Sequence, residues 1–251
     1  MQHAPKITTT DLLKLAGLAL VLVDHYGLFF AGEQTWWRVF GRPAAPIFFF
    51  LIGFARTGAI PASWLVLGAI LTGLDIISDG WDASLNILFS FALLRLALPR
   101  VETLVAHRRF GLPLLALLLA ALAPLFGNVI EYGLSGWLWA LLGLSARLAI
   151  AGEPGSALVR NIVALICGGF YLFSESLFWE LDFAQVFTLA LLTGALAATL
   201  LAFHRKDLEW SPPAPLARAL NCIGHRSLEI YAGSTIAMQV VSLMLDTEGE
   251  E

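Results

Sequence analysis

Two basic side chains on the first apolar segment have the types and spacing that proton transfer requires. Lys14 and His25 are separated by ten residues, which on a helix places them roughly 20° apart around the axis and ~16 Å apart along it. Asp11 lies on the same side, three residues before Lys14. Because an imidazole accepts and releases protons near neutral pH, His25 is the candidate base, and Lys14 is a cation nearer the start of the chain.

A structural interpretation of these residues stays open. Lys14 could extend to lipid headgroups, and His25 could be hydrogen-bonded to a neighbouring helix. Asp24, a third candidate catalytic residue, lies about 100° from His25 around the helix, so it need not orient the imidazole. Equally possible partners for that role are Asp11, Asp75 and Asn86.

The elements that position these side chains are expected to be membrane helices. The 251 residues are 58% hydrophobic and 14% charged, with a formal net charge of −4 and a mean hydropathy of +0.78. A soluble domain is typically ~45–50% apolar and about 25% charged, so the composition excludes a disordered chain, a basic nucleic-acid binder and an ordinary soluble enzyme. The apolar residues form continuous blocks, which favours helices over the alternating strands of a barrel. The two cysteines, Cys167 and Cys222, fit no disulfide framework.

The fold class is therefore predicted as all-α: a polytopic membrane bundle of about nine transmembrane helices, forming one domain over residues 1–251. The first helix is expected to be retained, since no convincing signal-peptide cleavage site follows it. Pro43–Ala55 is short for a full crossing and is expected to tilt, thin the bilayer or re-enter it. The nine apolar blocks are Asp11–Ala31, Pro43–Ala55, Ala62–Ser78, Ser84–Leu98, Phe110–Gly127, Leu134–Ile150, Ser156–Phe173, Phe183–Phe203 and Leu228–Leu245.

Charged residues sort to the two sides of this arrangement. With the N-terminus inside, all but two of the 15 Lys and Arg residues fall on the cytoplasmic side, and the two exceptions are Arg38 and Arg42. The odd connections and the C-terminal tail, which fall outside, are acidic. Because cytoplasmic loops are enriched in Lys and Arg, an N-in, C-out topology is predicted.

Three polar positions near the predicted outer face are candidate substrate ligands. Arg42 could pair with Asp24 or Asp79, or it could hold a carboxylate of an acceptor. Asp75 and Asp79 lie one helical turn apart and could bind a cation or line a pocket, although fraying into the headgroups is equally plausible. Asn86 opens the following helix.

Several short motifs follow one another in a specific order along nearly the whole chain. They are Asp11-Leu-Leu-Lys14, Val23-Asp24-His25, Gly41-Arg42-Pro43-Ala44-Ala45-Pro46-Ile47-Phe48, Thr57-Gly58, Leu85-Asn86-Ile87-Leu88-Phe89, Glu131-Tyr132-Gly133 and Arg226-Ser227-Leu228-Glu229-Ile230-Tyr231. Together they resemble the TraX family, membrane enzymes that N-acetylate pilin. The last motif also resembles the closing helix of the wider membrane acyltransferases, which often place Lys or Arg ten residues before a His in the first helix.

The resemblance implies an acetyltransferase of the bacterial cytoplasmic (inner) membrane. It would move an acetyl group from cytoplasmic acetyl-CoA, the expected co-substrate, to an extracytoplasmic acceptor such as the N-terminal amine of a pilin-like protein. His25 would remove a proton from the acceptor, and Lys14 would bind the CoA end or stabilise the oxyanion. The expected partners are the lipid bilayer, acetyl-CoA and the acceptor, with no metal and no nucleic acid. Candidates for binding the CoA phosphates are Lys14, Arg100, Arg108, Arg109, Arg205 and Lys206.

The closing segment departs from the family. Tyr231 and Ser234 are candidate substrate ligands there, but many relatives have a His soon after the closing Tyr, where this chain reads Tyr231-Ala-Gly-Ser234-Thr235. Ser234 can form hydrogen bonds but cannot act as a base near neutral pH. In a second departure, Ala59-Ile60-Pro61 replaces a basic, Tyr-containing turn.

Two other functions therefore stay open. A proton-coupled transporter would use the ionisable residues of the first and third helices as a relay. A non-catalytic membrane scaffold would explain the altered closing segment.

Overall fold

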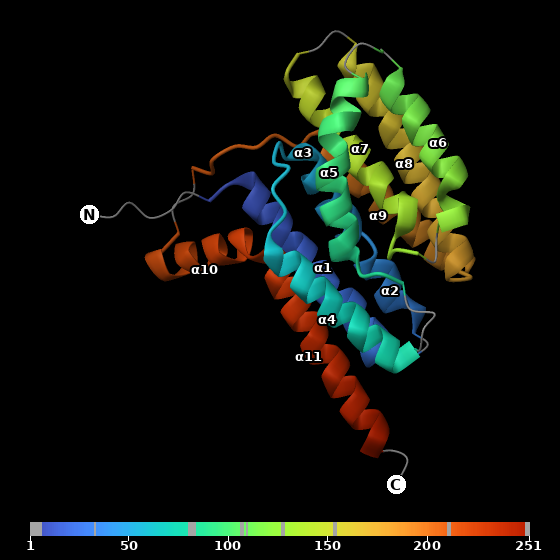
Figure 1. The fold of residues 1–251 in the computed structure, drawn as a ribbon, viewed down its shortest axis with the longest axis vertical. Coiled ribbons are helices and arrows are strands. Elements are labelled where there is room, and N and C mark those ends of the chain that lie inside the picture. The colour runs from blue at the N-terminus through green and yellow to red at the C-terminus, as the bar shows by residue number, and fades with distance from the viewer. Residues whose placement is uncertain are drawn as a thin grey trace.

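The computed structural model describes residues 7–32, 34–79, 84–105, 108, 110–126, 129–152, 155–209 and 212–248. The described part of the chain is helical, with two isolated β-bridges that pair Thr8 with Asp207 and Leu85 with Ile130. The helices are α1 (Thr9–Phe29), α2 (Thr35–Gly41), α3 (Ala44–Phe54), α4 (Ala62–Asp79), α5 (Ile87–Val105), α6 (Gly111–Phe126), α7 (Gly133–Ile150), α8 (Ser156–Phe178), α9 (Phe183–Leu201), α10 (Ala214–His225) and α11 (Ser227–Glu248) (Figure 1).

Each of the nine apolar blocks corresponds to a helix, and α2 and α10 are additional. Neither addition has the long apolar run that hydropathy detects. Helix α2 has only seven residues. Helix α10 is amphipathic, with polar residues such as Arg218 and Asn221 between its apolar ones.

Within the described residues, five helices are long and apolar enough to cross a membrane: α1, α7, α8, α9 and α11. Two shorter apolar stretches, Ala62–Ser78 and Gly111–Phe126, lie in α4 and α6. The all-α, membrane-helical class is therefore confirmed. The number of nine spans and the N-in, C-out topology stay predictions.

Helix α3 lies inside the bundle, against α1, α5 and α7 (Figure 1). Every residue from Ala44 to Gly53 is buried, as expected for a helix that is apolar on all sides. Its 11 residues span about 16 Å, roughly half of the ~30 Å hydrocarbon core. The short segment 43–55 is thus an enclosed helix, with other helices around it.

Glycines allow α3 to approach α7 closely. A Cβ on Gly53 would overlap the carbonyl of Ala140, and a Cβ on Gly143 would overlap the carbonyl of Phe50. Both obstacles are backbone atoms, which no side-chain rotation can remove. The two helix backbones can therefore meet only because these positions lack side chains.

We expect Gly53→Ala to destabilise the protein by about 1–3 kcal/mol, because α3 and α7 must separate to admit the methyl group. The measurement is the thermal unfolding midpoint of the purified protein in detergent. Gly169→Ala on α8 is the matched control, since no described heavy atom lies within 4 Å of the added Cβ. Equal midpoints for the two variants would contradict the close α3–α7 contact.

Helices α1 and α11 run in the same direction, so residues early in one meet residues early in the other. Lys14 donates a hydrogen bond to the carbonyl of Gly224, just before α11. Further along, Ser242 Oγ donates to the carbonyl of Phe29, 3.2 Å away. We call the end of the bundle where both helices begin the basic end, because Lys14, Arg56 and Arg205 lie there.

Candidate active site

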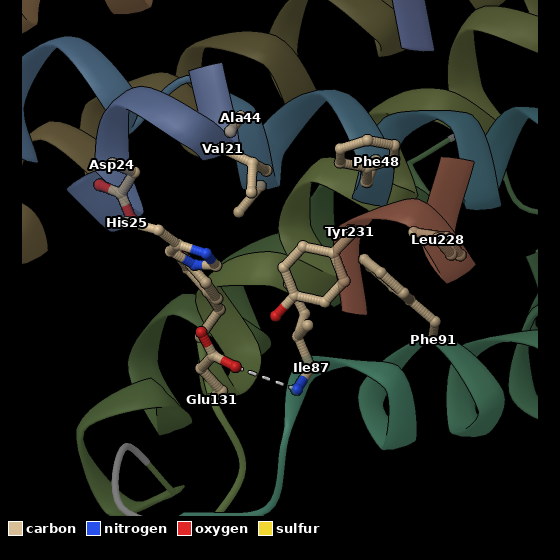
Figure 2. A pocket seen from close by; sticks show the side chains of 12 residues that line it. Val21, Asp24, His25, Ala44, Phe48, Ile87, Phe91, Glu131, Leu228 and Tyr231 are labelled. Carbon is tan, nitrogen blue, oxygen red and sulfur yellow. Dashed lines mark hydrogen bonds between the residues drawn. The ribbon is translucent and has the colours of Figure 1, made fainter. Parts of the chain in front are cut away.

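A small cavity lies in the middle of the bundle, between α1, α3, α5 and α11 and the connection from α6 to α7 (Figure 2). Its free space of about 20 Å³ has room for about one water molecule. We call it the central cavity. Its lining residues are Val21, Asp24, His25, Ala44, Ala45, Phe48, Ile87, Phe91, Glu131, Tyr132, Leu228 and Tyr231.

His25 is the buried imidazole of this cavity. Its Nδ1 lies 3.0 Å from Oγ1 of Thr235 on α11. Its ring also contacts the ring of Tyr231, with the centroids 5.7 Å apart. Figure 2 shows the imidazole beside the Tyr231 ring and above the Glu131 carboxylate. The described contacts of His25 are therefore one side-chain hydrogen bond and ring contacts with Tyr231 and Phe29, and the imidazole borders a space with room for about one water molecule.

Glu131 contributes a carboxylate to the same cavity from the connection between α6 and α7. Its Oε2 accepts hydrogen bonds from the Ile87 amide at 3.1 Å and from Asn86 Nδ2 at 3.4 Å. Burial raises the pKa of Glu131 to about 7, although the hydrogen bond from Ile87 opposes this. A carboxylate with this pKa can bind or release a proton near neutral pH.

Asp24 takes part in a buried ion cluster at the far end of α1. Its carboxylate lies 2.9 Å from Arg38 Nη1 and 2.9 Å from Arg42 Nη2. Arg42 Nη1 also lies 3.3 Å from Glu175 on α8, and both guanidinium groups stack over the ring of Trp179. Of the two intramolecular partners left open for Arg42, Asp24 and Asp79, the structure pairs it with Asp24.

Gly41 permits this cluster to form. A Cβ at this position would overlap the backbone and side chain of Asp24, so α2 can cross α1 closely only with glycine there. The crossing places Arg38 and Arg42, which flank Gly41, around the Asp24 carboxylate. The cluster therefore joins α1, α2 and α8 at the end of the bundle opposite the basic end.

A larger pocket of about 650 Å³ opens at the basic end. We call it the basic basin. It is lined by segments from α1, α3, α10 and α11 and by five cationic side chains, Lys14, Arg56, Arg95, Arg147 and Arg205. Arg147 is paired with Glu102 at 2.7 Å. Arg95 stacks over Trp64, 4.1 Å from its centroid.

The basic basin and the central cavity share two lining residues, Phe48 of α3 and Leu228 of α11. These two side chains therefore form the partition between a cationic pocket and a buried imidazole. In Figure 2 they lie beyond Tyr231 as seen from His25. A molecule with an anionic head and a long apolar arm could bind in the basin and reach His25 by displacing them.

Comparison with known proteins shows the family of the chain. The family model described as TraX protein matches residues 9–206. The chain belongs to the TraX family. The matched region contains Lys14, His25 and Glu131 but ends before α10 and α11.

A relative in this family is Protein TraX from Escherichia coli, which is 32% identical over 174 residues. The match covers 62% of this chain and 63% of the relative, so the chain spans less than two thirds of that protein's length. No solved structure matches the chain significantly.

The remaining substrate-ligand candidates of this TraX-family chain lie at different distances from the cavity. Tyr231 lines the cavity, and Asn86 is hydrogen-bonded to its Glu131. Asp75 Oδ1 accepts a hydrogen bond from Gln239 Nε2 at 3.0 Å, which joins α4 to α11. Ser234 Oγ donates to the carbonyl of Tyr231 on its own helix. Their roles toward a substrate stay predictions.

The predicted phosphate ligands separate into two groups. Lys14 and Arg205 line the basic basin. Arg100 and Arg108 line two other grooves on α5 and near the start of α6, and Arg109 lies outside the described residues. The structure therefore brings the first two candidates together and leaves Arg100 and Arg108 elsewhere.

Sequence reasoning missed two polar residues of the site, Thr235 and Glu131. Glu131 looks like one of several acidic loop residues, and only its position in the TraX-like motif Glu131-Tyr132-Gly133 distinguishes it. Thr235 lies outside all the TraX-like motifs of the sequence, so no motif marks it. Its contact with His25 joins residues that are 210 positions apart.

Proposed function

We propose that this chain is a membrane acetyltransferase that moves an acetyl group from acetyl-CoA, bound at the basic end, to an acceptor that reaches His25 from the opposite side. Membership of the TraX family supports this proposal. The observation that carries it is the shared wall of the basic basin and the central cavity, formed by Phe48 and Leu228. Acetyl transfer needs the thioester carbonyl carbon to come within reach of the acceptor nitrogen and of the base that deprotonates it, and Phe48 and Leu228 line both pockets that would supply these groups.

The basic basin suits the phosphates of CoA. Guanidinium and ammonium groups bind phosphate oxygens through charge-assisted hydrogen bonds, and five such groups line the basin. Its volume of about 650 Å³ is within the roughly 300–1,000 Å³ of typical ligand pockets. The pantetheine arm would pass between Phe48 and Leu228, and both side chains would rotate to admit the thioester.

The chemistry would require two proton acceptors at the cavity. A protonated primary amine must lose one proton before its nitrogen can attack the thioester carbonyl. The C–N bond then forms, the C–S bond breaks, and the nitrogen loses a second proton. We assign the first proton to Glu131 and the second to His25, which passes it to the departing CoA thiolate. The products are an N-acetylated acceptor, free CoA and one proton released by Glu131.

The acceptor is proposed to be the N-terminal amine of a pilin-like protein on the extracytoplasmic side of the bacterial inner membrane, as the family resemblance implies. The carboxylate of Glu131 favours an amine over a hydroxyl acceptor, because it can hold an ammonium group beside His25 before deprotonation. A hydroxyl acceptor carries no positive charge, so it would gain a hydrogen bond from this carboxylate but no ion pair.

Binding of acetyl-CoA tests the proposal directly. A ligand present at about 100 times its Kd stabilises a protein by about 2.7 kcal/mol, so acetyl-CoA should raise the thermal unfolding midpoint by several degrees. We expect Arg56→Ala and Arg205→Ala each to weaken binding about 10-fold, since each removes a charged hydrogen-bond donor from the basin.

Arg100→Ala is the matched control, because Arg100 lies in a different groove and should leave the affinity unchanged. A weakening by Arg100→Ala alone would move the CoA site away from the basin. Complete absence of acetyl-CoA binding by the unmodified protein would instead favour a transporter or a scaffold.

A further inference from the structure

The hydrogen bond between His25 and Thr235 fixes more than the position of the ring. Oγ1 of Thr235 lies 3.0 Å from His25 Nδ1 and 2.9 Å from the backbone carbonyl oxygen of Tyr231. Both side chains are buried, so water does not compete freely for these contacts. One hydroxyl group therefore takes part in two hydrogen bonds at once.

The hydrogens can be assigned by counting donors. A threonine hydroxyl has a single hydrogen to donate, and a carbonyl oxygen has none. The 2.9 Å contact between Thr235 Oγ1 and the Tyr231 carbonyl oxygen is therefore possible only if the hydroxyl hydrogen lies between these two oxygens. The hydrogen between Oγ1 and His25 must then come from the imidazole, which places it on Nδ1.

The opposite assignment is unfavourable. If Thr235 donated to His25 Nδ1, the two oxygens at 2.9 Å would face each other with lone pairs and no hydrogen between them. Ser234 Oγ donates to the same carbonyl at 2.8 Å, but its hydrogen cannot relieve that contact. Only the Nδ1–H tautomer satisfies all the contacts of Thr235 together.

We propose that Thr235 is a positioning residue that holds His25 as the Nδ1–H tautomer and so keeps Nε2 unprotonated as the proton-accepting atom. This role rests on the acetyl transfer proposed above. A neutral histidine carries a hydrogen on only one ring nitrogen. The hydrogen bond that the ring makes decides which nitrogen that is. In serine proteases a carboxylate has this task, whereas Thr235 does it with a neutral hydroxyl whose own hydrogen is committed to the Tyr231 carbonyl.

A neutral partner has a chemical consequence. A carboxylate beside Nδ1 would stabilise the imidazolium formed when Nε2 takes a proton, but a hydroxyl adds no charge. The proton on Nε2 would accordingly be held weakly and passed on readily. Thr235 thus gives His25 a hydrogen-bond partner within the closing segment Tyr231-Ala-Gly-Ser234-Thr235.

The test uses two substitutions that differ in the hydroxyl. Thr235→Val keeps the shape of the side chain and removes the oxygen, whereas Thr235→Ser keeps the oxygen. The tautomer of His25 is read from ¹⁵N chemical shifts of the full-length protein labelled at histidine and reconstituted in lipid. The His25 signals are assigned by their absence in His25→Gln, since the chain has 5 histidines.

We expect Nδ1–H in the unmodified protein and in Thr235→Ser, and a shift toward Nε2–H in Thr235→Val. Acetyl transfer should fall about 10- to 100-fold in Thr235→Val, with unchanged acetyl-CoA affinity, and should be largely retained in Thr235→Ser. Either an Nε2–H tautomer in the unmodified protein or an unaltered tautomer and rate in Thr235→Val would overturn the proposal.

The two proposals can fail separately. If the unmodified protein binds no acetyl-CoA and transfers no acetyl group, the proposed function fails. The ¹⁵N spectra of the same samples still decide whether Thr235 sets the tautomer of His25.

Discussion

Replacing His25 by alanine is expected to abolish acetyl transfer while the protein still inserts into the membrane and folds. A positioned general base contributes typically about 10²–10⁴-fold to a rate, so kcat/KM should fall by at least that range. The reason is that the central cavity would keep its carboxylate at Glu131 but lose the imidazole that borders it. The measurement is transfer of a radiolabelled acetyl group to a peptide with the N-terminal sequence of a pilin, in membranes containing equal amounts of each variant.

Two further variants make this result specific. His25→Gln retains a polar side chain of similar size without a base, and it should be as inactive as His25→Ala. His204→Ala removes an exposed imidazole whose partner among the described contacts is the carbonyl oxygen of Ala202, and it should retain full activity. Transfer at the unmodified rate by His25→Ala would remove His25 from the mechanism.

Asp24→Ala is expected to produce the largest loss of stability among the single substitutions considered for this chain. Asp24 is 4% exposed, and its carboxylate lies against two guanidinium groups. Its removal leaves Arg38 without the carboxylate and Arg42 with Glu175 alone. Breaking a buried pair in this way costs about 3–5 kcal/mol. For a chain of this size that corresponds to a fall of roughly 6–20 °C in Tm.

The control for this variant is Glu209→Ala, which removes an exposed carboxylate and should change the stability by less than about 0.5 kcal/mol. The double variant Asp24→Ala, Arg38→Met should recover part of the loss, because it also removes the guanidinium group that the single variant leaves without a carboxylate. A Tm for Asp24→Ala equal to that of the control would show that the buried cluster does not hold α1 and α2 together.

These two expectations give neighbouring residues different roles. Asp24 and His25 follow each other in the sequence but face different surroundings. The Asp24 carboxylate turns to Arg38 and Arg42, whereas the His25 imidazole turns to Thr235 on α11. We therefore propose that Asp24 supports the site by fixing the far end of α1, and that His25 is the member of the pair that touches the substrate.

Much of the fold could be predicted because hydropathy and charge are summed over many neighbouring residues. An apolar block of about 20 residues must be helical to satisfy its backbone in lipid, whatever its partners are. The nine helical blocks and the membrane class follow from this kind of local information, and the structure confirms them. The TraX relationship follows instead from the order of short motifs along the chain, and the family match confirms it. Helices α2 and α10 escaped prediction because one is short and the other is amphipathic.

The sequence alone also identified His25, Lys14 and Arg42 as ionisable residues that need a partner in an apolar setting. It could not choose those partners, because they lie far away along the chain. Lys14 meets Gly224 and His25 meets Thr235, in each case across 210 positions, and Arg42 meets Glu175 across 133.

Only the tertiary structure decided which helices approach each other and which side chains share a cavity. That choice depends on close packing at particular points, such as Gly41 beside Asp24 and Gly53 beside Ala140, where a single added methyl group would change the approach. The sequence thus showed which ionisable residues could take part in chemistry and how far apart they lie along the chain. Their grouping into a basin, a partition and a cavity was set by contacts between helices, which no local pattern encodes.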